Sequence, residues 1–335
     1  TSALLARLLG TEGFGALAIA MTAVNFVITF IDAQTDEALI RFMGAALARG
    51  ERDSALTYFY AAVMVDGVVA LAALVVVILV VPPVIRLYPN GALLEQMAWI
   101  YLITAPFNIL QNNFESIFKT LKYFRLTTLI RIVTSLLALI LLTALATQGV
   151  VPVIWGYVAI TIITFLAYAG FAIGLLLKHL RGARPGGYRA VFRELMPFVL
   201  HTSFMGSLKS IAGNIDILLL GALASTSAVG FFKLARSAVN LIALPVAPVT
   251  TVVYPLMNEA WAVGNLARVK QLISRFMLYS AVISSGLALI FLVGADFLVR
   301  LIYTAEFIAV ANLIRIMSIG VVLEPIMGWV RTAAL

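Results

Sequence analysis

The sequence contains no cysteine and only two histidines, His179 and His201, among its 335 residues. The absence of cysteine excludes disulfides, thiolate zinc sites and cysteine nucleophiles. Neither histidine has a second ligand at helical spacing, so we expect no metal site. We likewise expect no cofactor.

Charged residues are also scarce. They make up 11% of the chain, whereas 63% is hydrophobic, and the mean hydropathy is +1.07. A soluble globular protein is about 45–50% apolar and about 25% charged, so this composition cannot cover a water-exposed surface. It predicts an all-α polytopic membrane protein. Long polar stretches are absent, which excludes a sizeable soluble domain.

Apolar runs divide the chain into membrane spans, each of which needs about 20 residues. The expected spans are 1–9 (the end of a truncated first span), 13–35, 56–81, 96–118, 124–147, 151–178, 194–222, 227–257, 272–296 and one from 306. The predicted domains are an N-terminal bundle at 1–178, a basic cytoplasmic linker at 179–193, and a C-terminal bundle at 194–335. We expect the second bundle to be incomplete in this chain.

Lysines and arginines concentrate on alternate loops and span ends, as expected for the side that stays cytoplasmic. Fifteen of the 23 lie on one set: Arg41, Arg49, Arg52, Lys119, Lys122, Arg125, Arg131, Lys178, Arg181, Arg184, Arg189, Arg193, Arg268, Lys270 and Arg275. The opposite set holds Arg7, Arg86 and Arg300. This asymmetry places the linker and the N-terminus in the cytoplasm. The net charge of +8 is then a topology signal, and we expect no nucleic-acid partner.

Two segments of the chain repeat each other. Residues 13–26 align with residues 228–241, and Asn25 pairs with Asn240. Both copies begin a span that enters from the same side, and parallel halves of this kind are a transporter arrangement with substrate bound between them. Chance similarity between apolar helices is the competing explanation.

The expected helix at 202–223 has one polar and one apolar half. Lys209, Asn214 and Asp216 lie on the polar half with several serines and glycines. At 100° per residue this half is too wide to face lipid, so it must face other helices or water. Lys209 and Asp216 are seven positions apart, about 10.5 Å along the axis, so a direct ion pair would be strained.

The next expected helix carries a narrower polar stripe. Its members, at i, i+3, i+4 and i+7, are Lys233, Arg236, Ser237 and Asn240. A cation at the centre of a membrane helix costs about 2.5–3.5 kcal/mol. Either Lys233 reaches out to the membrane surface and Lys209 pairs with Asp216, or these cations line a water-filled cavity that receives an anion.

Acidic and amide residues occur in three earlier spans. Asp32 ends the span at 13–35, where hydration or pairing with Arg41 would also explain it, and Asp66 lies inside the next span. The span at 96–118 carries Asn108, Gln111, Asn112 and Glu115.

Two long segments resemble the polysaccharide flippases of the multidrug/oligosaccharidyl-lipid/polysaccharide exporter (MOP) superfamily. Their N-terminal signature is similar to ARLLGTEGFGALAIA…ALIRFMGAALARGERDSA. The start of their second half is similar to NIDILLLGALASTSAVGFFKLARSAVNLI…VYPLMNEAWAVGN. The resemblance implies two pseudo-symmetric six-helix bundles around a central cavity, working by alternating access in a bacterial or archaeal plasma (inner) membrane.

The resemblance also implies a substrate and its ligands. The substrate would be a polyprenyl-pyrophosphate-linked oligosaccharide, flipped from the cytoplasmic to the outer leaflet for polysaccharide export. Carried over by position, the implied sites are Lys209, Lys233 and Arg236 for pyrophosphate; Asn25, Asn240, Ser237 and Asn214 for the polar cavity lining; and Asp32, Asp66 and Asp216 for coupling to an H⁺ or Na⁺ gradient. Membrane lipids and other polysaccharide-assembly proteins are the further partners implied.

Three rival functions remain open. A multidrug exporter of the same superfamily would need a buried carboxylate near aromatic rings to take organic cations, and the cationic stripe argues against it. A membrane glycosyltransferase or polymerase would need catalytic carboxylates or an arginine-rich external loop, and the external loops are short. A non-transporting scaffold in a polysaccharide synthesis complex is the least well excluded. We therefore expect a transporter and no enzymatic activity.

Overall fold

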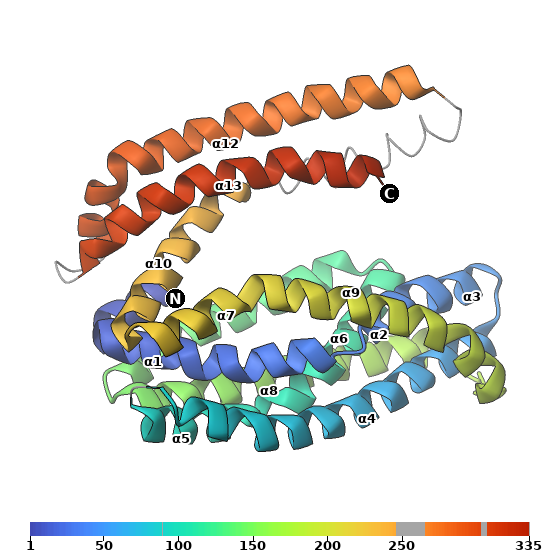
Figure 1. Ribbon diagram of the computed structural model, residues 1–335. Coiled ribbons are helices and arrows are strands. Elements are labelled where there is room, and N and C mark those ends of the chain that lie inside the picture. The colour runs from blue at the N-terminus through green and yellow to red at the C-terminus, as the bar shows by residue number, and fades with distance from the viewer. Residues whose placement is uncertain (89, 246–264, 303–306, 335) are drawn as a thin grey trace. The chain divides into compact units, whose positions relative to one another are not determined.

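The computed structural model describes residues 1–88, 90–245, 265–302 and 307–334, and these are overwhelmingly helical (Figure 1). The elements, in chain order, are α1 (Ser2–Ile31), α2 (Thr35–Ala38), the π-helix η1 (Leu39–Met43), α3 (Gly44–Ala48), α4 (Arg52–Ile85), α5 (Gly91–Leu102), α6 (Thr104–Thr120), α7 (Phe124–Ala146), α8 (Val150–His179), α9 (Tyr188–Leu223), α10 (Thr226–Ala243), α12 (Leu266–Ile302) and α13 (Ala309–Ala334).

Within the described ranges, seven helical segments are long and apolar enough to cross a membrane: α1, α4, the α5–α6 pair, α7, α8, α9 and α12. Their outward faces are apolar. On α4, for example, Val68, Leu71 and Leu79 are each about two-thirds exposed, at 68%, 66% and 67%. Such surface is stable in lipid and costly in water. The predicted polytopic helical membrane fold is confirmed.

Most helix boundaries fall within a few residues of the predicted spans, with two differences of detail. The first and second spans, expected as separate helices, form the single element α1, which is broken at Gly10, where φ is 71°. The second difference follows the span at 13–35. Residues 35–48, expected as a polar connection, are helical as α2, η1 and α3. The expected span at 227–257 begins as α10, and its later part lies outside the described residues.

Backbone contacts divide the chain into two compact units, described here separately. The first comprises Thr1 and Glu12–Thr226, and the second comprises Ser2–Thr11 and Ser227–Leu335. The boundary lies beyond the basic segment at 179–193 where the sequence analysis divided the chain. The reason is α9, whose Val191, Leu195 and Val199 belong to the core of the first unit.

The core of the first unit joins five of its helices. Leu39 of η1, Phe59 of α4, Phe118 of α6, Tyr168 of α8 and Leu195 of α9 belong to one buried cluster. Each of these five side chains is less than a tenth exposed. Burial of large apolar and aromatic side chains at one place fixes the relative positions of these helices.

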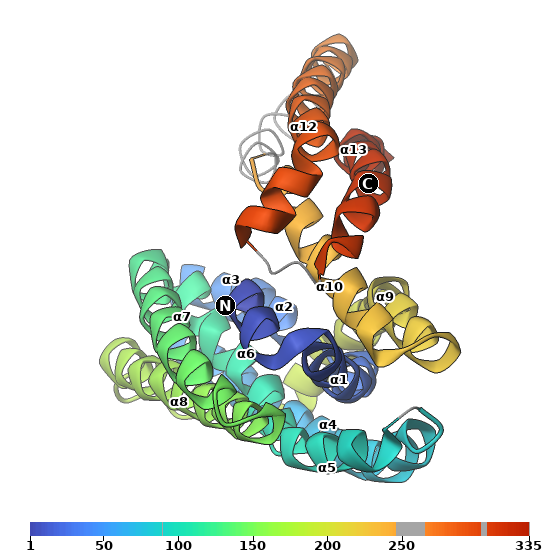
Figure 2. The same cartoon turned by 90° about the vertical axis from the view of Figure 1, so that its left-hand side faces the viewer.

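The second unit is built on the pair α12 and α13, which lie side by side along their lengths (Figures 1 and 2). Small residues such as Ala295 and Ala311 are fully or almost fully buried and allow the close approach. Arg315 of α13 pairs with Asp296 of α12 at 2.6 Å. This pair satisfies an arginine that would otherwise face lipid.

Removal of the Tyr58 hydroxyl tests the attachment of α9 to the first unit. Tyr58 on α4 donates a 2.5 Å hydrogen bond to Glu194 on α9. A hydrogen bond to a carboxylate contributes about 1–3 kcal/mol, so Tyr58→Phe should lower the midpoint of thermal unfolding in detergent. Tyr60→Phe is the matched control, because Tyr60 is 42% exposed on the same helix. Equal effects of the two variants would contradict this assignment.

Candidate functional site

The helical path of α1 is interrupted at residues 32–34, called here the interruption. α1 ends at Ile31 and α2 starts at Thr35, while Gln34 between them is left-handed, with φ 47° and ψ 41°. The backbone amide of Gln34 donates to the Asp32 carboxylate at 3.4 Å. A helix end exposes backbone carbonyls that no longer have a helical partner, and each must be satisfied elsewhere.

Serines of α9 satisfy two of the exposed carbonyls. The Ser207 hydroxyl donates to the carbonyl of Phe30 at 2.6 Å. The Ser203 hydroxyl lies between two acceptors, the carbonyl of Ala33 at 2.9 Å and that of Val199 in its own helix at 2.6 Å. Gly206 lies between these serines on the same face of α9. The polar half of the helix at 202–223 therefore serves, in part, to hold the interruption.

A buried carboxylate lies close to this interruption. Asp66 on α4 is 1% exposed, Asn113 on α6 is fully buried, and Thr35 is 1% exposed. The Thr35 hydroxyl donates to the Asn113 side-chain oxygen at 2.8 Å, and the Asn113 side-chain nitrogen donates to Asp66 Oδ2 at 2.7 Å. Asp66 Oδ1 has no hydrogen-bond partner among the described residues. These three residues are called the acid site.

Two more carboxylates stand at the interruption, outside the spanning segments. Burial raises the pKa of Asp32 to about 6, although the hydrogen bond from the backbone amide of Gln34 acts to lower it. Burial also raises the pKa of Asp36, which the charge of Lys119 opposes. Both Asp32 and Asp36 are near enough to Asp66 for their charges to repel its own. The charge state of each of these three acids therefore affects the others.

The structure brings close to each other two of the three acids that the sequence analysis proposed for ion coupling, Asp32 and Asp66. It adds Thr35 and Asn113, which that analysis missed. On α6 the sequence analysis named Asn112, the neighbour of Asn113, which is the residue that bonds Asp66. A usable signal existed, because Asn113 shares a helix face with Ile109 and Ile117, which are at most 1% exposed.

The second unit carries the cationic stripe of α10, made of Lys233, Arg236, Ser237 and Asn240. Lys233 and Arg236 are half-buried, and Ser237 and Asn240 are exposed. The opposite side of α10 is fully buried at Leu234, Ala235 and Val239. The helix therefore buries its apolar side and leaves the predicted polar stripe on the other side.

The remaining predicted residues lie in the first unit. The Asn25 amide donates to the Tyr101 hydroxyl at 3.1 Å. On α9, the Asn214 amide donates to the Ser210 carbonyl at 3.2 Å, and Asp216 accepts from the Ile217 amide at 2.8 Å. Lys209 also belongs to α9, and its side chain lies outside what the structure describes.

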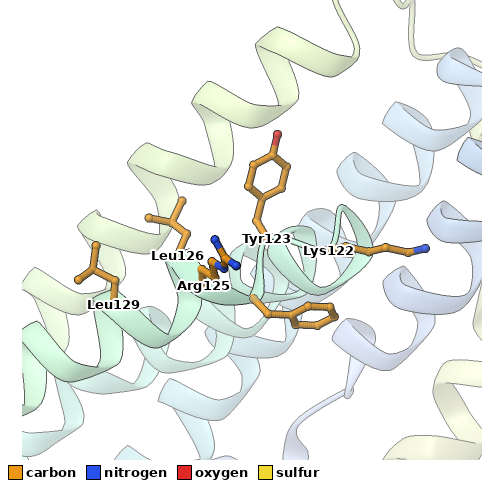
Figure 3. Close-up of a pocket in the computed structure, with 6 residues that line it drawn as sticks. Lys122, Tyr123, Arg125, Leu126 and Leu129 are labelled. Atoms are coloured by element: carbon orange, nitrogen blue, oxygen red, sulfur yellow. The ribbon is translucent and has the colours of Figure 1, made fainter.

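Two open hollows of the first unit are lined by basic residues. The first, of about 620 Å³, is formed where α7 begins, by Lys122, Tyr123, Phe124, Arg125, Leu126 and Leu129 (Figure 3). The second, of about 580 Å³, is lined by Gly187, Arg189, Ala190 and Arg193. Neither includes a residue proposed for substrate, and both come from loops expected to be cytoplasmic.

Solved structures show which class of protein has this fold. An inward-facing multidrug resistance MATE family transporter of the MOP superfamily is 14% identical, with a TM-score of 0.78 and 97% of this chain and 77% of that chain covered. The Vibrio cholerae MATE transporter VcmN in its bent form is 16% identical, with a TM-score of 0.64 and coverages of 99% and 83%. At these identities the likeness establishes the fold, that of MOP-superfamily transporters.

A third structure belongs to a MOP superfamily transporter from Pyrococcus furiosus. It is 17% identical, with a TM-score of 0.62, and the match covers 97% of this chain and 75% of that chain. The polarity of its binding pocket is described as reversed, which suggests a different function for that protein.

A comparison with protein-family models identifies the family within this class of transporters. The family model described as polysaccharide biosynthesis protein matches residues 1–261. The chain belongs to this family. A comparison with curated proteins gives no match. Family and fold together confirm the resemblance to the MOP superfamily and indicate a multi-pass membrane transporter.

The contact between Gly206 and the interruption can be tested by adding a methyl group. A Cβ at position 206 would overlap the Gln34 side-chain amide. Overpacking of this kind costs about 1–3 kcal/mol, so Gly206→Ala should lower the thermal unfolding midpoint, and Gln34→Ala in the same chain should restore most of it. Gly213→Ala is the control, since a Cβ there meets nothing within 4 Å. Equal stability of the two single variants would refute the contact.

Titration of Asp32 should make stability depend on pH. Because its pKa is raised from 3.8 to about 6, the native state binds more protons than the unfolded state between those values, and stability is lost as pH rises through about 6. Asp32→Asn removes that loss. The variant should match the wild type near about pH 4.5 and exceed its unfolding midpoint near about pH 7.5. Glu37→Gln, at an exposed carboxylate of α2, is the control, and a gap that does not change with pH would contradict the assignment.

Proposed function

We propose that this protein flips a polyprenyl-pyrophosphate-linked oligosaccharide from the cytoplasmic to the outer leaflet by alternating access. Its setting would be the plasma (inner) membrane of a bacterium or archaeon, with the N-terminus cytoplasmic. The observation that carries the proposal is the cationic stripe on α10, in a membrane chain of the polysaccharide biosynthesis protein family. No catalytic step is required of any residue.

The energetics of the stripe favour an anionic ligand. Lysine and arginine within a membrane helix are costly and usually mark a substrate pathway. A pyrophosphate offers several charged oxygens, and charge-assisted hydrogen bonds to them are strong where water is scarce. Lys233 and Arg236 would bind the pyrophosphate, with Lys209 as a third cation. Ser237, Asn240, Asn25 and Asn214 would bind sugar hydroxyls.

An organic-cation exporter is the second candidate, because two of the matched structures belong to MATE transporters. A positively charged stripe would repel an organic cation. The Pyrococcus furiosus structure supports the view that pocket polarity varies within this fold. We therefore rank the anionic lipid-linked substrate first.

The test is transport by the full-length protein in liposomes, with a labelled polyprenyl-pyrophosphate oligosaccharide. The variant Lys233→Ala/Arg236→Ala should lose at least about tenfold in flipping rate, because each lost charge-assisted contact is worth about 1.5–3 kcal/mol. Membrane insertion should be unchanged. Lys233→Arg/Arg236→Lys keeps both charges and should retain most of the rate.

Arg268→Ala/Lys270→Ala provides a matched loss of two charges at exposed positions of α12 and should flip at the wild-type rate. Equal flipping by the wild type and the α10 double alanine variant would refute the role of the stripe. If the wild type moves a labelled organic cation and not the oligosaccharide, the second candidate replaces the first. Movement of neither would favour a scaffold.

A further inference from the structure

The hollow at the start of α7, called here the α7 hollow, combines basic and apolar side chains. Its two cations are Lys122 and Arg125, and its lining includes Phe124 and Leu129, which are 59% and 56% exposed. α7 is one of the helices able to cross a membrane, and it begins at Phe124. The hollow therefore lies where this helix leaves the lipid, and it presents charge and apolar surface together.

The protein supplies no carboxylate to the cations of the hollow. From Ser116 to Arg193 the sequence has nine lysines and arginines and no aspartate or glutamate. The preceding acid, Glu115, is already paired with Lys119 and Arg131, at 3.2 and 2.7 Å. Among the described residues, no ion pair includes Lys122 or Arg125. The positive charge of the hollow is therefore left for a ligand to neutralise.

Tyr123 brings the basic end of α8 to the same place. Its hydroxyl lies 3.4 Å from Nε2 of His179, and the two rings meet edge to face with centroids 5.9 Å apart. His179 is the last residue of α8. Lys178 precedes it and Arg181 follows two residues later, and both are exposed. Cations from two helix ends thus gather beside one hollow.

An anionic phospholipid matches both properties of this surface. Basic sites between transmembrane helices at the membrane surface bind negatively charged headgroups, and hydrogen bonds from cations to phosphate oxygens are strong. Leu126 and Leu129 lie to one side of Arg125, and Lys122 lies to the other (Figure 3). A headgroup at Arg125 would place an acyl chain along the leucines, whereas a free phosphate would leave the apolar lining unused.

The other basic hollow of the first unit provides a comparison. It has a similar volume, about 580 Å³, and two exposed arginines, Arg189 and Arg193. The rest of its lining is Gly187 and Ala190, so it offers charge without a large apolar side chain. Charge alone therefore does not distinguish the two hollows, but the surface for an acyl chain does.

We propose that the α7 hollow binds the headgroup of an anionic phospholipid, with an acyl chain along Leu126 and Leu129, and that the bound lipid fastens the start of α7 to the end of α8. This is a specific site, in addition to the general contact with lipid that any membrane helix makes. It does not depend on the transported substrate. A ligand that binds only the native state stabilises it, so the stability of the protein should depend on anionic lipid.

Native mass spectrometry of the full-length protein, titrated with phosphatidylglycerol or with phosphatidylcholine of the same chains, tests the site. The wild type should bind phosphatidylglycerol at least about fivefold more tightly, and Lys122→Gln/Arg125→Gln should lose this preference. Glutamine keeps a long polar side chain at Lys122, where φ is 63°. Lys122→Arg/Arg125→Lys and the matched control Arg189→Gln/Arg193→Gln should retain the preference. Equal preference in the wild type and the first variant would overturn the proposal.

Competition identifies the part of the ligand that is recognised. Inorganic phosphate and glycerophosphoglycerol, which has the headgroup without chains, should not displace phosphatidylglycerol at equal concentration. Displacement by either would show a site for anions alone and would overturn the assignment to a lipid. Displacement by a polyprenyl pyrophosphate and not by a second phospholipid would assign the hollow to the transported substrate, and would also overturn the proposal.

Thermal unfolding in lipid nanodiscs covers the case in which the double variant does not fold. The wild type should unfold at a higher temperature in phosphatidylglycerol than in phosphatidylcholine. The single variant Arg125→Gln should lose much of this difference, and Arg189→Gln should keep it. The same difference in Arg125→Gln as in the wild type would refute the site. The α10 double alanine variant should still prefer phosphatidylglycerol, so this result stands apart from the outcome of the transport assay.

Discussion

Backbone groups buried inside a protein have no bulk water to bind, and the packing of α9 against the start of the chain follows from that constraint. Residues 32–34 leave the helical path and expose carbonyls that must find donors. The hydroxyls of Ser203 and Ser207 supply them from a helix far along the chain. α9 consequently packs with the earlier helices, and the compact unit extends to Thr226.

The same interruption explains where polarity gathers in this unit. Thr35 begins the resumed helix, and its hydroxyl is bonded to Asn113, which in turn bonds Asp66. Asp32 and Asp36 stand at either end of the short break. A helix that continued unbroken from Ile31 would hydrogen-bond its own backbone, and Thr35 would point in a different direction. The break and the acid site are therefore one structural feature.

α10 follows a simpler principle. It buries one apolar side and leaves lysine, arginine, serine and asparagine on the other. Charged residues within membrane helices usually face the interior of the bundle or a water-filled cavity. The first unit thus carries buried carboxyl groups, and the second carries a cationic stripe.

The order of the chain and its composition were sufficient to predict the class of fold. Runs of about 20 apolar residues, ended by charged loops, predicted the spans that became α4, α7, α8 and α9, because such runs are stable only as helices in lipid. Gly10 breaks α1 where the first two spans were expected to meet. The stripe on α10 was also readable, since residues at three-and-four spacing share a helix face.

The contacts that make the acid site were decided only by the tertiary structure. The sequence places Asn113 on the apolar face of α6 with Ile109 and Ile117, but it does not identify Thr35 and Asp66 as its partners, because these depend on which helices that face meets. Nor does periodicity predict that Ser203 and Ser207 bond carbonyls of a helix at the start of the chain. Sequence determines which face of a helix is polar; only packing between helices far apart in the sequence determines which groups that face meets.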